Sequence, residues 1–265
     1  MSEVRHRPRK RFGQHFLSDP RVVGQLLAAI APAGEDVLVE IGPGTGVLTA
    51  PLLERCRRLH AVEIDRDLAR LLGERFTGHP SFVLHCADAL RFPWGSLQGD
   101  APLRVVGNLP YNISTELLFR LLDHLSLIRD MHFMLQREVV ERLAAPPGGR
   151  AYGRLSVMVQ YHCAVKPLFS VPAGAFRPPP RVESAVVRLE PRPRPLAARR
   201  PEDFAALVRT AFQHRRKTLR NALKPLLAGG RESAIPVDLE RRPETLSVEE
   251  YVHLANWISE QREPA

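Results

Sequence analysis

The amino-acid sequence predicts an α/β fold, in which helices cover both faces of a parallel sheet, followed by a small all-helical domain. Three observations in the 265 residues predict this arrangement. Short apolar runs alternate with segments of helical periodicity as far as Pro146, as in chains that build parallel sheets. Beyond Pro146 this alternation gives way to a loop and β-branched runs. From Glu202 onward the periodicity is helical.

The first half of the chain supplies the predicted sheet and its helices. The first helix is expected over residues 20–30, with Asp19 as its N-cap and Pro20 in its first turn. The later strands and helices follow from apolar periodicity: strands over 37–41, 58–65, 81–90 and 103–111, helices over 46–56, 66–76 and 114–125, and a strand that passes into a helix over 130–143.

The second half is expected to end in a separate domain. Residues 191–201 are rich in proline and arginine and predict a linker. Ser247, followed by Glu250, forms a capping box at the start of the last helix. We therefore expect a domain over residues 1–192 with a basic N-terminal arm and a helical domain over 193–265. The remaining expected elements are a loop over 146–154, strands over 156–171 and 184–189, and helices over 202–227 and 247–261.

Composition excludes several classes of protein. With 44% apolar and 25% charged residues, the chain has ordinary globular composition. No apolar run approaches the roughly 18 residues of a membrane span, and the first residues lack the apolar core of a signal peptide. A cytoplasmic location and no membrane partner are therefore expected. The cysteines Cys56, Cys86 and Cys163 lack zinc or redox spacing, so we expect reduced structural thiols and no metal site.

The positive charge is concentrated in three segments. The chain carries 38 Lys and Arg against 29 Asp and Glu, a net charge of +9. Residues 1–20 have a net charge of +3, residues 171–200 have +5, and residues 210–224 hold five bases and no acid. Residues 21–170 have only +1. This distribution indicates a polyanionic partner such as nucleic acid. The alternative is a basic proteome that uses arginine freely on protein surfaces.

A glycine loop follows the strand over residues 37–41. Gly42, Gly44 and Gly46 remove side chains where the backbone turns sharply and approaches a ligand. Their spacing is G-x-G-x-G, whereas dinucleotide-binding proteins have G-x-G-x-x-G. A dehydrogenase is therefore the weakest alternative. A tight strand-to-helix turn without a ligand is the structural alternative.

Two acidic residues end the next two strands. Glu63 can accept hydrogen bonds from both ribose hydroxyls of a nucleoside, whereas Asp65 is placed to cap the following helix. Asp88 can accept a hydrogen bond from an adenine amine. Either acid alone is more often a cap or a solvated turn residue. Together with the glycine loop they form the pattern of an S-adenosyl-L-methionine pocket, because ligands of open α/β sheets bind at these strand ends.

The fourth strand ends in the tetrapeptide Asn108-Leu109-Pro110-Tyr111. The exocyclic amine of a base is a poor nucleophile, and two acceptors that hold its hydrogens place it for in-line attack. The Asn108 side chain and the Pro110 carbonyl can be these acceptors, and Tyr111 can stack on an extruded base. The alternative is a strand followed by an ordinary proline turn.

These motifs resemble the ribosomal RNA adenine N6,N6-dimethyltransferase family over nearly the whole chain. The matching segments are K10-R-F-G-Q-H-F-L17, E40-I-G-P-G-T-G-V-L-T49, V62-E-I-D65, D88-A, G107-N-L-P-Y-N-I-S114, F176-R-P-P-P-R-V-E-S-A-V186 and R215-R-K-T-L-R-N221. The resemblance implies a Rossmann-like S-adenosylmethionine-dependent methyltransferase sheet. It implies dimethylation of two adjacent adenines in the 3′-terminal hairpin of 16S rRNA by a monomer, on the small (30S) subunit or its precursor.

Site residues carry over from this resemblance position by position. Phe176 is implied to stack on the second face of the adenine, in a proline-locked loop that suits an exposed aromatic ring; without the family it would be a core residue. His15 stands where many relatives have Asn. The implied set is Asn108, Pro110, Tyr111 and Phe176 for the target adenine, and His15, Leu17, Gly42, Gly44, Gly46, Glu63, Asp88 and Asn108 for the cofactor.

Basic residues are expected to bind RNA phosphates, which supply affinity and salt dependence rather than base selectivity. The alternative is a solvated helix face. Two rivals remain for the function: a 23S rRNA adenine methyltransferase of the antibiotic-resistance type, and a ribosome-assembly factor that uses RNA binding alone. The expected RNA-binding residues are Arg9, Lys10, Arg11, Arg215, Arg216, Lys217 and Arg220.

Overall fold

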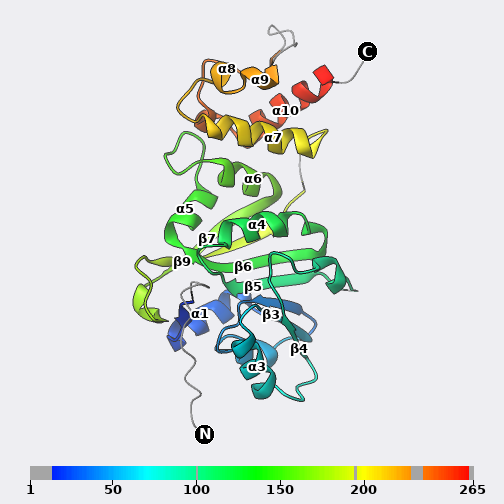
Figure 1. Ribbon diagram of the computed structural model, residues 1–265, viewed down its shortest axis with the longest axis vertical. Coiled ribbons are helices and arrows are strands. Elements are labelled where there is room, and N and C mark those ends of the chain that lie inside the picture. Colours follow the sequence, from blue (N-terminus) through cyan, green and yellow to red (C-terminus); the bar gives the residue numbers. More distant parts are fainter. Residues whose placement is uncertain (1–13, 100, 194–195, 228–234, 263–265) are drawn as a thin grey trace. The chain divides into compact units, whose positions relative to one another are not determined.

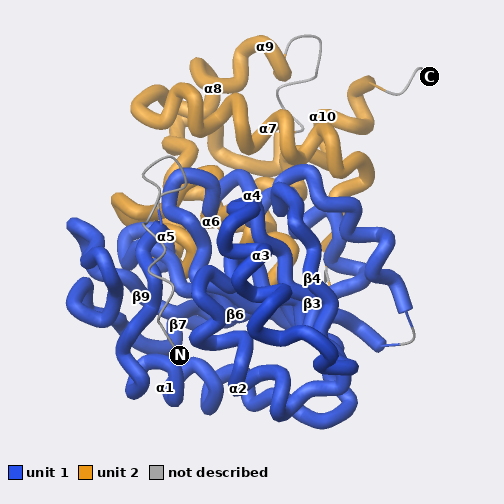
Figure 2. The backbone as a smooth tube through the Cα atoms, turned by 60° about the horizontal axis from the view of Figure 1, so that its bottom comes forward, with its two compact units in different colours: residues 1–140, 166–191 blue, residues 141–165, 192–265 orange. Residues whose placement is uncertain are grey.

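A computed structural model describes residues 14–99, 101–193, 196–227 and 235–262 (Figure 1). The chain divides into two compact units, residues 1–140 with 166–191 and residues 141–165 with 192–265, which Figure 2 shows in blue and orange. The expected helical domain over 193–265 falls within the second unit. That unit also includes residues 141–165, which the sequence placed in the first domain.

Most strands lie close to the positions that apolar periodicity predicts, but the two-residue strands over 16–17 and 176–177 were not predicted. The structure has β1 (Phe16–Leu17), β2 (Val37–Ile41), β3 (Arg58–Glu63), β4 (Phe82–Cys86), β5 (Leu103–Asn108), β6 (Ile128–Gln136), β7 (Cys163–Val171), β8 (Phe176–Arg177) and β9 (Ser184–Pro191).

The helices of the first half also follow the prediction, and the Asp19 side chain caps the first of them by accepting from the Arg21 N–H. The structure has α1 (Pro20–Ile30), α2 (Thr49–Leu53), α3 (Arg66–Arg75), α4 (Ser114–Leu122), α5 (Arg137–Ala144), α6 (Arg154–His162), α7 (Pro201–Gln213), α8 (Leu219–Ala222), α9 (Lys224–Leu227) and α10 (Val248–Arg262).

The central sheet confirms the predicted α/β class. Within the described residues it has seven strands in the order β4-β3-β2-β5-β6-β9-β7, and β1 pairs separately with β8. Strands β2 to β6 pair in parallel, whereas β9 runs antiparallel to β6. Because β2, β3, β4 and β5 are parallel neighbours, their carboxyl ends meet at one edge of the sheet.

Both faces of the sheet are covered. Val106 and Met134 belong to an apolar cluster that includes side chains of α1 and α2. Val105 and Phe133 precede them in the same strands and therefore point to the opposite face, yet they are equally buried. The sheet thus has a buried interior on each side, as expected of a parallel sheet.

A buried arginine joins the first helix to the sheet. The Arg104 guanidinium donates to Asp36 at 2.6 Å and to Asp130 at 3.0 and 3.1 Å. It also donates to the carbonyl oxygens of Ile30 at 2.5 Å and Ala31 at 3.2 Å, at the end of α1. Arg104 is only 4% exposed, so these bonds compensate the cost of burying its charge.

The sequence prediction of a strand over 156–171 is wrong in its first half. Residues 154–162 form α6, and the strand begins only at Cys163. Every residue from Leu155 to Val159 is buried, so this stretch of the helix has no alternation of buried and exposed positions. A helix segment that is buried on every side lacks the periodicity that distinguishes a helix from a strand.

Of the two predicted C-terminal helices, the first is interrupted and the last lies within one residue of its predicted position. The expected helix over 202–227 is interrupted after Gln213, and residues 214–217 form a turn before α8. The predicted capping box is confirmed: the Glu250 N–H donates to Ser247 Oγ at 3.1 Å and the Ser247 N–H donates to Glu250 Oε2 at 2.8 Å.

Removing the Arg104 guanidinium should destabilise the fold strongly. Arg104→Met leaves the buried Asp36 and Asp130 carboxylates without this partner, and we expect the free energy of unfolding to fall by about 3–5 kcal/mol. Urea denaturation at pH 7 measures it. The control is Arg129→Met, because Arg129 also pairs with Asp36 but is 45% exposed at its side chain. That change should cost less than about 1 kcal/mol. Equal losses in the two variants would contradict the assignment.

Candidate functional site

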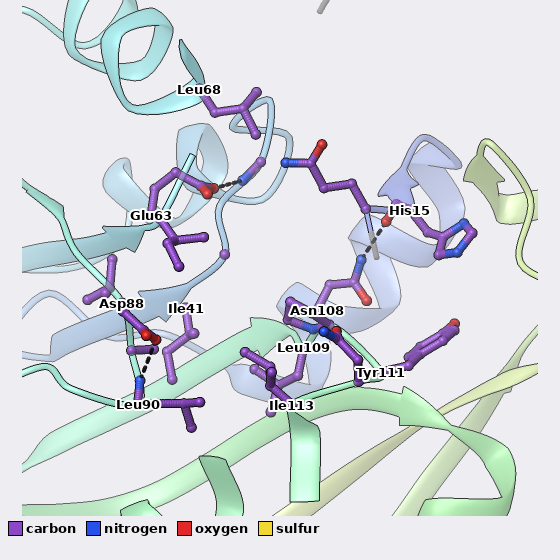
Figure 3. A pocket seen from close by; sticks show the side chains of 18 of the residues that line it. His15, Ile41, Glu63, Leu68, Asp88, Leu90, Asn108, Leu109, Tyr111 and Ile113 are labelled. Atoms are coloured by element: carbon purple, nitrogen blue, oxygen red, sulfur yellow. Dashed lines mark hydrogen bonds between the residues drawn. The ribbon is translucent and has the colours of Figure 1, made fainter. Parts of the chain in front are cut away.

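A cavity of about 270 Å³ lies at the carboxyl ends of β2, β3, β4 and β5 (Figure 3). Open α/β sheets bind their ligands at this edge. The segment before β1 and the turns after the four strands form its walls. The structure thereby brings together these residues that the sequence analysis singled out: His15, Gly42, Gly44, Glu63, Asp88, Asn108, Pro110 and Tyr111.

The glycine loop has the left-handed backbone that its sequence predicts. The φ angles of Gly42, Gly44 and Gly46 are 66°, 60° and 79°, which residues with a Cβ rarely adopt. A Cβ on Gly44 would also lie 3.0 Å from the Phe16 ring. Gly46 does not line the cavity. Its Cα faces Leu72 of α3, and a Cβ there would lie 2.9 Å from that side chain.

Glu63 is the acid that faces the cavity at the end of β3. It is 4% exposed and accepts hydrogen bonds from the N–H groups of Gly44 at 3.2 Å and Asp65 at 2.9 Å. Burial raises its pKa to about 7, although these backbone hydrogen bonds lower it. Asp65 caps α3 by accepting from the Asp67 N–H, as the sequence predicts.

Asp88 lies across an apolar part of the cavity from Glu63. Its Oδ1 atom accepts from the Leu90 N–H at 3.0 Å, as Figure 3 shows. A carboxylate has two oxygens and about four acceptor sites, so it can accept further hydrogen bonds. The wall near the two acids suits a flat ring with polar edges, because it is formed by the side chains of Ile41, Val62, Ile64, Leu68 and Leu90.

Asn108 is oriented by the segment before β1. Its Nδ2 atom donates to the His15 carbonyl oxygen at 2.8 Å. Because the amide nitrogen makes this bond, the Oδ1 atom keeps its capacity to accept. The preceding Gly107 allows β5 to approach β2 closely, since a Cβ there would lie 2.5 Å from the Ile41 carbonyl oxygen.

Tyr111 is fixed at both its hydroxyl and its ring. The hydroxyl lies 2.6 Å from Ser184 Oγ, and burial raises the Tyr111 pKa. The His15 ring stacks on it with 5.8 Å between centroids and 25° between planes. His15 Nδ1 lies 2.8 Å from the Pro178 carbonyl oxygen. Because a carbonyl oxygen only accepts, Nδ1 carries a hydrogen and donates it.

Three residues expected at the site do not line this cavity: Leu17, Gly46 and Phe176. The expectation that Phe176 is exposed is wrong, since it is 1% exposed. It pairs with Leu17 between β8 and β1 and packs in the apolar cluster under α1. The proline-rich sequence after Phe176 predicted a stiff loop, but it carried no signal for this strand pairing.

The expected RNA-binding residues separate into three groups. Arg9, Lys10 and Arg11 lie outside the described residues. Arg216 and Lys217 are exposed in the turn after α7, not on a helix. Neither side chain has a hydrogen bond or an ion pair with another described residue, so both side chains are available to an external anion. Two others are engaged within the second unit: Arg215 donates to the carbonyl oxygens of Gly149 and Arg150 and pairs with Glu244, and Arg220 pairs with Glu240.

Sequence reasoning missed how the site residues are held. Ser184 had no expected role, yet it positions Tyr111. Gln14 lines the cavity and donates to Asp65 at 3.1 Å. Within the resemblance, His15 and Ser184 lay in matched segments, but nothing in their spacing showed that they contact the fourth strand.

Other features bear on cofactors and location. In the described parts of the chain, no cluster of three or more His, Cys, Asp or Glu residues could hold a metal ion. No helix among those residues is long and apolar enough to cross a bilayer. All three cysteines are unpaired, with Cys56 and Cys163 buried and Cys86 exposed.

Solved structures support the fold. A dimethyladenosine transferase from Plasmodium falciparum superposes with a TM-score of 0.77 at 24% identity, covering 93% of this chain and 98% of that one. The 23S rRNA methyltransferase ErmE superposes with a TM-score of 0.68 at 24% identity, covering 92% of this chain and 99% of that one. The Rossmann-like sheet with C-terminal helices is therefore a methyltransferase fold.

Sequence comparison identifies the family. The chain is 54% identical over 255 residues to the ribosomal RNA small subunit methyltransferase A of Saccharophagus degradans, covering 96% of this chain and 95% of that protein. It is 54% identical over 263 residues to the protein of the same name from Pseudomonas aeruginosa, covering 98% of each. The sequence model of the family described as ribosomal RNA adenine dimethylase matches residues 5–260. The chain therefore belongs to the ribosomal RNA adenine dimethylase family.

Proposed function

We propose that this chain transfers methyl groups from S-adenosyl-L-methionine to the N6 amines of two adjacent adenines in the 3′-terminal hairpin of 16S rRNA. The observation that carries the proposal is the orientation of Asn108, whose Oδ1 atom is left to accept beside the strand-end cavity. The names of the relatives from Saccharophagus degradans and Pseudomonas aeruginosa support the small subunit as the substrate particle.

The cavity fits the proposed cofactor by its donors and acceptors. Glu63 would accept from the ribose hydroxyls, Asp88 would accept from the adenine amine, and the side-chain-free backbone of Gly42 and Gly44 would lie against the ligand. S-adenosyl-L-methionine supplies a methyl group activated by a sulfonium. The protein supplies placement and electrostatics.

The target amine would be held by two acceptors. Asn108 Oδ1 is one, and the Pro110 carbonyl oxygen is the other. The Pro110 oxygen already accepts from the Ile113 N–H at 3.2 Å, but a carbonyl oxygen has two lone pairs. Both hydrogens of the amine would then point at acceptors, which aims the nitrogen lone pair in one direction. Tyr111 would fix the plane of the base by stacking.

The substrate defines the expected setting of the reaction. The enzyme would act on the 30S subunit or its precursor in the cytoplasm, as a step of small-subunit biogenesis. We expect the enzyme to act as a monomer. Exposed Arg216 and Lys217 would add phosphate contacts.

Transfer of tritium from labelled S-adenosylmethionine tests the function. We expect label in dimethyladenosine of small subunits that lack this modification and none in unmethylated large subunits.

Asn108→Ala should lower transfer by about 100-fold or more, because it removes a transition-state acceptor, while cofactor binding stays measurable. Asn256→Ala in the second unit is the control and should transfer normally. Label in large subunits alone would favour the 23S-type enzyme, and cofactor binding without transfer would favour an assembly factor.

Cofactor affinity should rise with pH through the Glu63 titration. Since the free protein has a Glu63 pKa of about 7, the carboxylate that accepts from two hydroxyls is the major form only above that pH. Affinity at pH 6 should be up to about tenfold weaker than at pH 8, measured by calorimetry. Glu63→Gln should bind weakly and without this dependence.

Glu40→Gln is the matched control for the Glu63 titration. Burial also raises the pKa of Glu40 to about 7. However, its carboxylate accepts a hydrogen bond from the Thr49 hydroxyl, and Glu40 does not line this cavity. The Glu40→Gln variant should therefore keep the pH dependence of cofactor binding. Equal wild-type affinity at pH 6 and pH 8 would argue against the ribose contact of Glu63.

Arg216→Glu combined with Lys217→Glu should weaken RNA binding and reduce its salt dependence. Losing two phosphate contacts should lower the slope of log affinity against log salt by about 1.5, measured by filter binding at several salt concentrations. The control is Arg66→Glu with Arg70→Glu, the same charge change on the exposed side of α3. An unchanged slope in the Arg216→Glu, Lys217→Glu variant would show that this turn does not contact RNA phosphates.

A further inference from the structure

A second pocket lies at the opposite edge of the central sheet, and we call it the amino-edge pocket. It measures about 230 Å³ and is lined by the first residue of β2, the residues where β3 begins and the segment before β5. Its described polar lining residues are Arg57, Arg58, His60, Ser96 and Gln98. All of them belong to the first unit, so the pocket lies within that unit.

Strand β2 separates the amino-edge pocket from the strand-end cavity. Val37, the first residue of β2, lines the amino-edge pocket, whereas Ile41, the last, lines the strand-end cavity. A strand rises about 3.3 Å per residue, so these two positions lie about 13 Å apart. The amino-edge pocket is therefore distinct from the site proposed for cofactor and adenine, and the function proposed above gives it no role.

The charge of the amino-edge pocket comes from two adjacent arginines. Arg57 and Arg58 are exposed, and their side chains have no hydrogen bond or ion pair with another described residue. By contrast, exposed Arg70 pairs with Glu74 on α3. No acid is found among the described residues that line the pocket. Two neighbouring cations without a counterion at a concave surface indicate an anionic ligand.

The nearby Asp36 holds the backbone of these arginines, but its carboxylate is used elsewhere. Its carbonyl oxygen accepts from the N–H groups of Arg57 at 3.0 Å and Arg58 at 3.3 Å, which fixes the chain where β3 begins. The Asp36 carboxylate is buried and pairs with Arg104 at 2.6 Å and Arg129 at 2.9 Å. The charges of Arg57 and Arg58 therefore remain available to a ligand.

His60 lies in a positive environment at the side of this pocket. Its Nδ1 atom lies 3.0 Å from His85 Nε2. Burial, His85 and Arg58 together lower the pKa of His60 to about 4. The imidazole is therefore neutral at pH 7, and the positive charge that an anion would meet belongs to the arginines.

The donors of the amino-edge pocket suit a phosphate group better than a carboxylate. Each guanidinium presents five N–H donors in a planar fork that matches phosphate oxygens. The exposed Ser96 hydroxyl and Gln98 amide add neutral donors, and neither side chain bonds to another described residue. Because a phosphate group carries more oxygens than a carboxylate, it can accept from the arginines and the neutral donors together.

We propose that the amino-edge pocket binds a phosphate group, held by Arg57 and Arg58 and by the donors of Ser96 and Gln98. The RNA backbone and small phosphorylated molecules share this chemistry, and the experiments below separate these two sources. The proposal goes beyond the proposed function and does not depend on methyl transfer, because phosphate binding is measured without cofactor or ribosomal subunits.

A titration with inorganic phosphate at constant ionic strength tests the site. The Gln98 side-chain amide, followed by NMR, should shift saturably with phosphate but not with chloride or acetate. Arg57→Gln combined with Arg58→Gln should weaken phosphate binding by about tenfold or more, because it removes charge-assisted hydrogen bonds. Arg66→Gln combined with Arg70→Gln is the control, since it makes the same charge change on α3, and phosphate affinity should stay at the wild-type value.

A smaller change at the pocket keeps the test independent of folding. Ser96→Ala retains both arginines and removes one neutral donor, so phosphate affinity should fall by about threefold. Melting temperatures close to wild type would show that the variants fold.

Binding of small ribosomal subunits identifies the source of the phosphate. If the source is RNA, Arg57→Gln with Arg58→Gln should lower the slope of log affinity against log salt by about 1.5. If that variant has lost phosphate binding but keeps the wild-type slope, the source is a small phosphorylated molecule.

Three results would overturn the proposal: a Gln98 shift that does not saturate, a shift of the same size with acetate, or an equal loss of affinity in the Arg66→Gln, Arg70→Gln control. A wild-type protein that binds phosphate here but transfers no methyl group to small subunits would count against the proposed function and leave this site intact.

Discussion

The buried Arg104 guanidinium is the interaction on which the arrangement of the first unit depends. It joins the end of α1 to strands β5 and β6 and to Asp36, which immediately precedes β2. Burial alone would raise the pKa of Asp130, but the nearby His132 ring and the hydrogen bonds from Arg104 lower it to about 2. Both carboxylates stay ionised around a fixed cation, so the position of α1 on the sheet is set by directional bonds as well as by apolar packing.

This position of α1 determines the geometry of the site at the other end of the helix. The N–H groups of Ser18 and Asp19, just before α1, donate to the Ala175 carbonyl oxygen. Adjacent Leu17 pairs with Phe176. The same short segment brings the His15 carbonyl oxygen to Asn108. Buried Phe176 thus helps to hold the N-terminal segment over the strand ends. If Phe176 were exposed, that segment would lose its strand partner.

The sequence predicted the parts of the site that depend on strand ends, and it failed where tertiary contacts decide. Glu63, Asp88 and Asn108 each end a strand that apolar runs identify, and parallel strands place their ends together. The α6 segment was mistaken for a strand because its side chains are buried on every side. The turn at Arg215 was mistaken for helix because its hydrogen bonds reach Gly149 and Arg150, 66 and 65 residues earlier in the chain, which no local pattern shows.

The two buried acids at the glycine loop show what the site costs the fold. In the unfolded chain, Glu40 and Glu63 have ordinary pKa values of about 4.5, whereas burial raises both to about 7 in the folded protein. The folded state therefore binds more protons between these values, and these groups make folding less favourable as pH rises from about 4.5 to 7. This cost is largely present at neutral pH, and Glu63, one of the two acids, lines the cavity. A ligand that donates hydroxyl groups to the Glu63 carboxylate stabilises the ionised form, and cofactor binding is thereby coupled to the stability of the sheet edge.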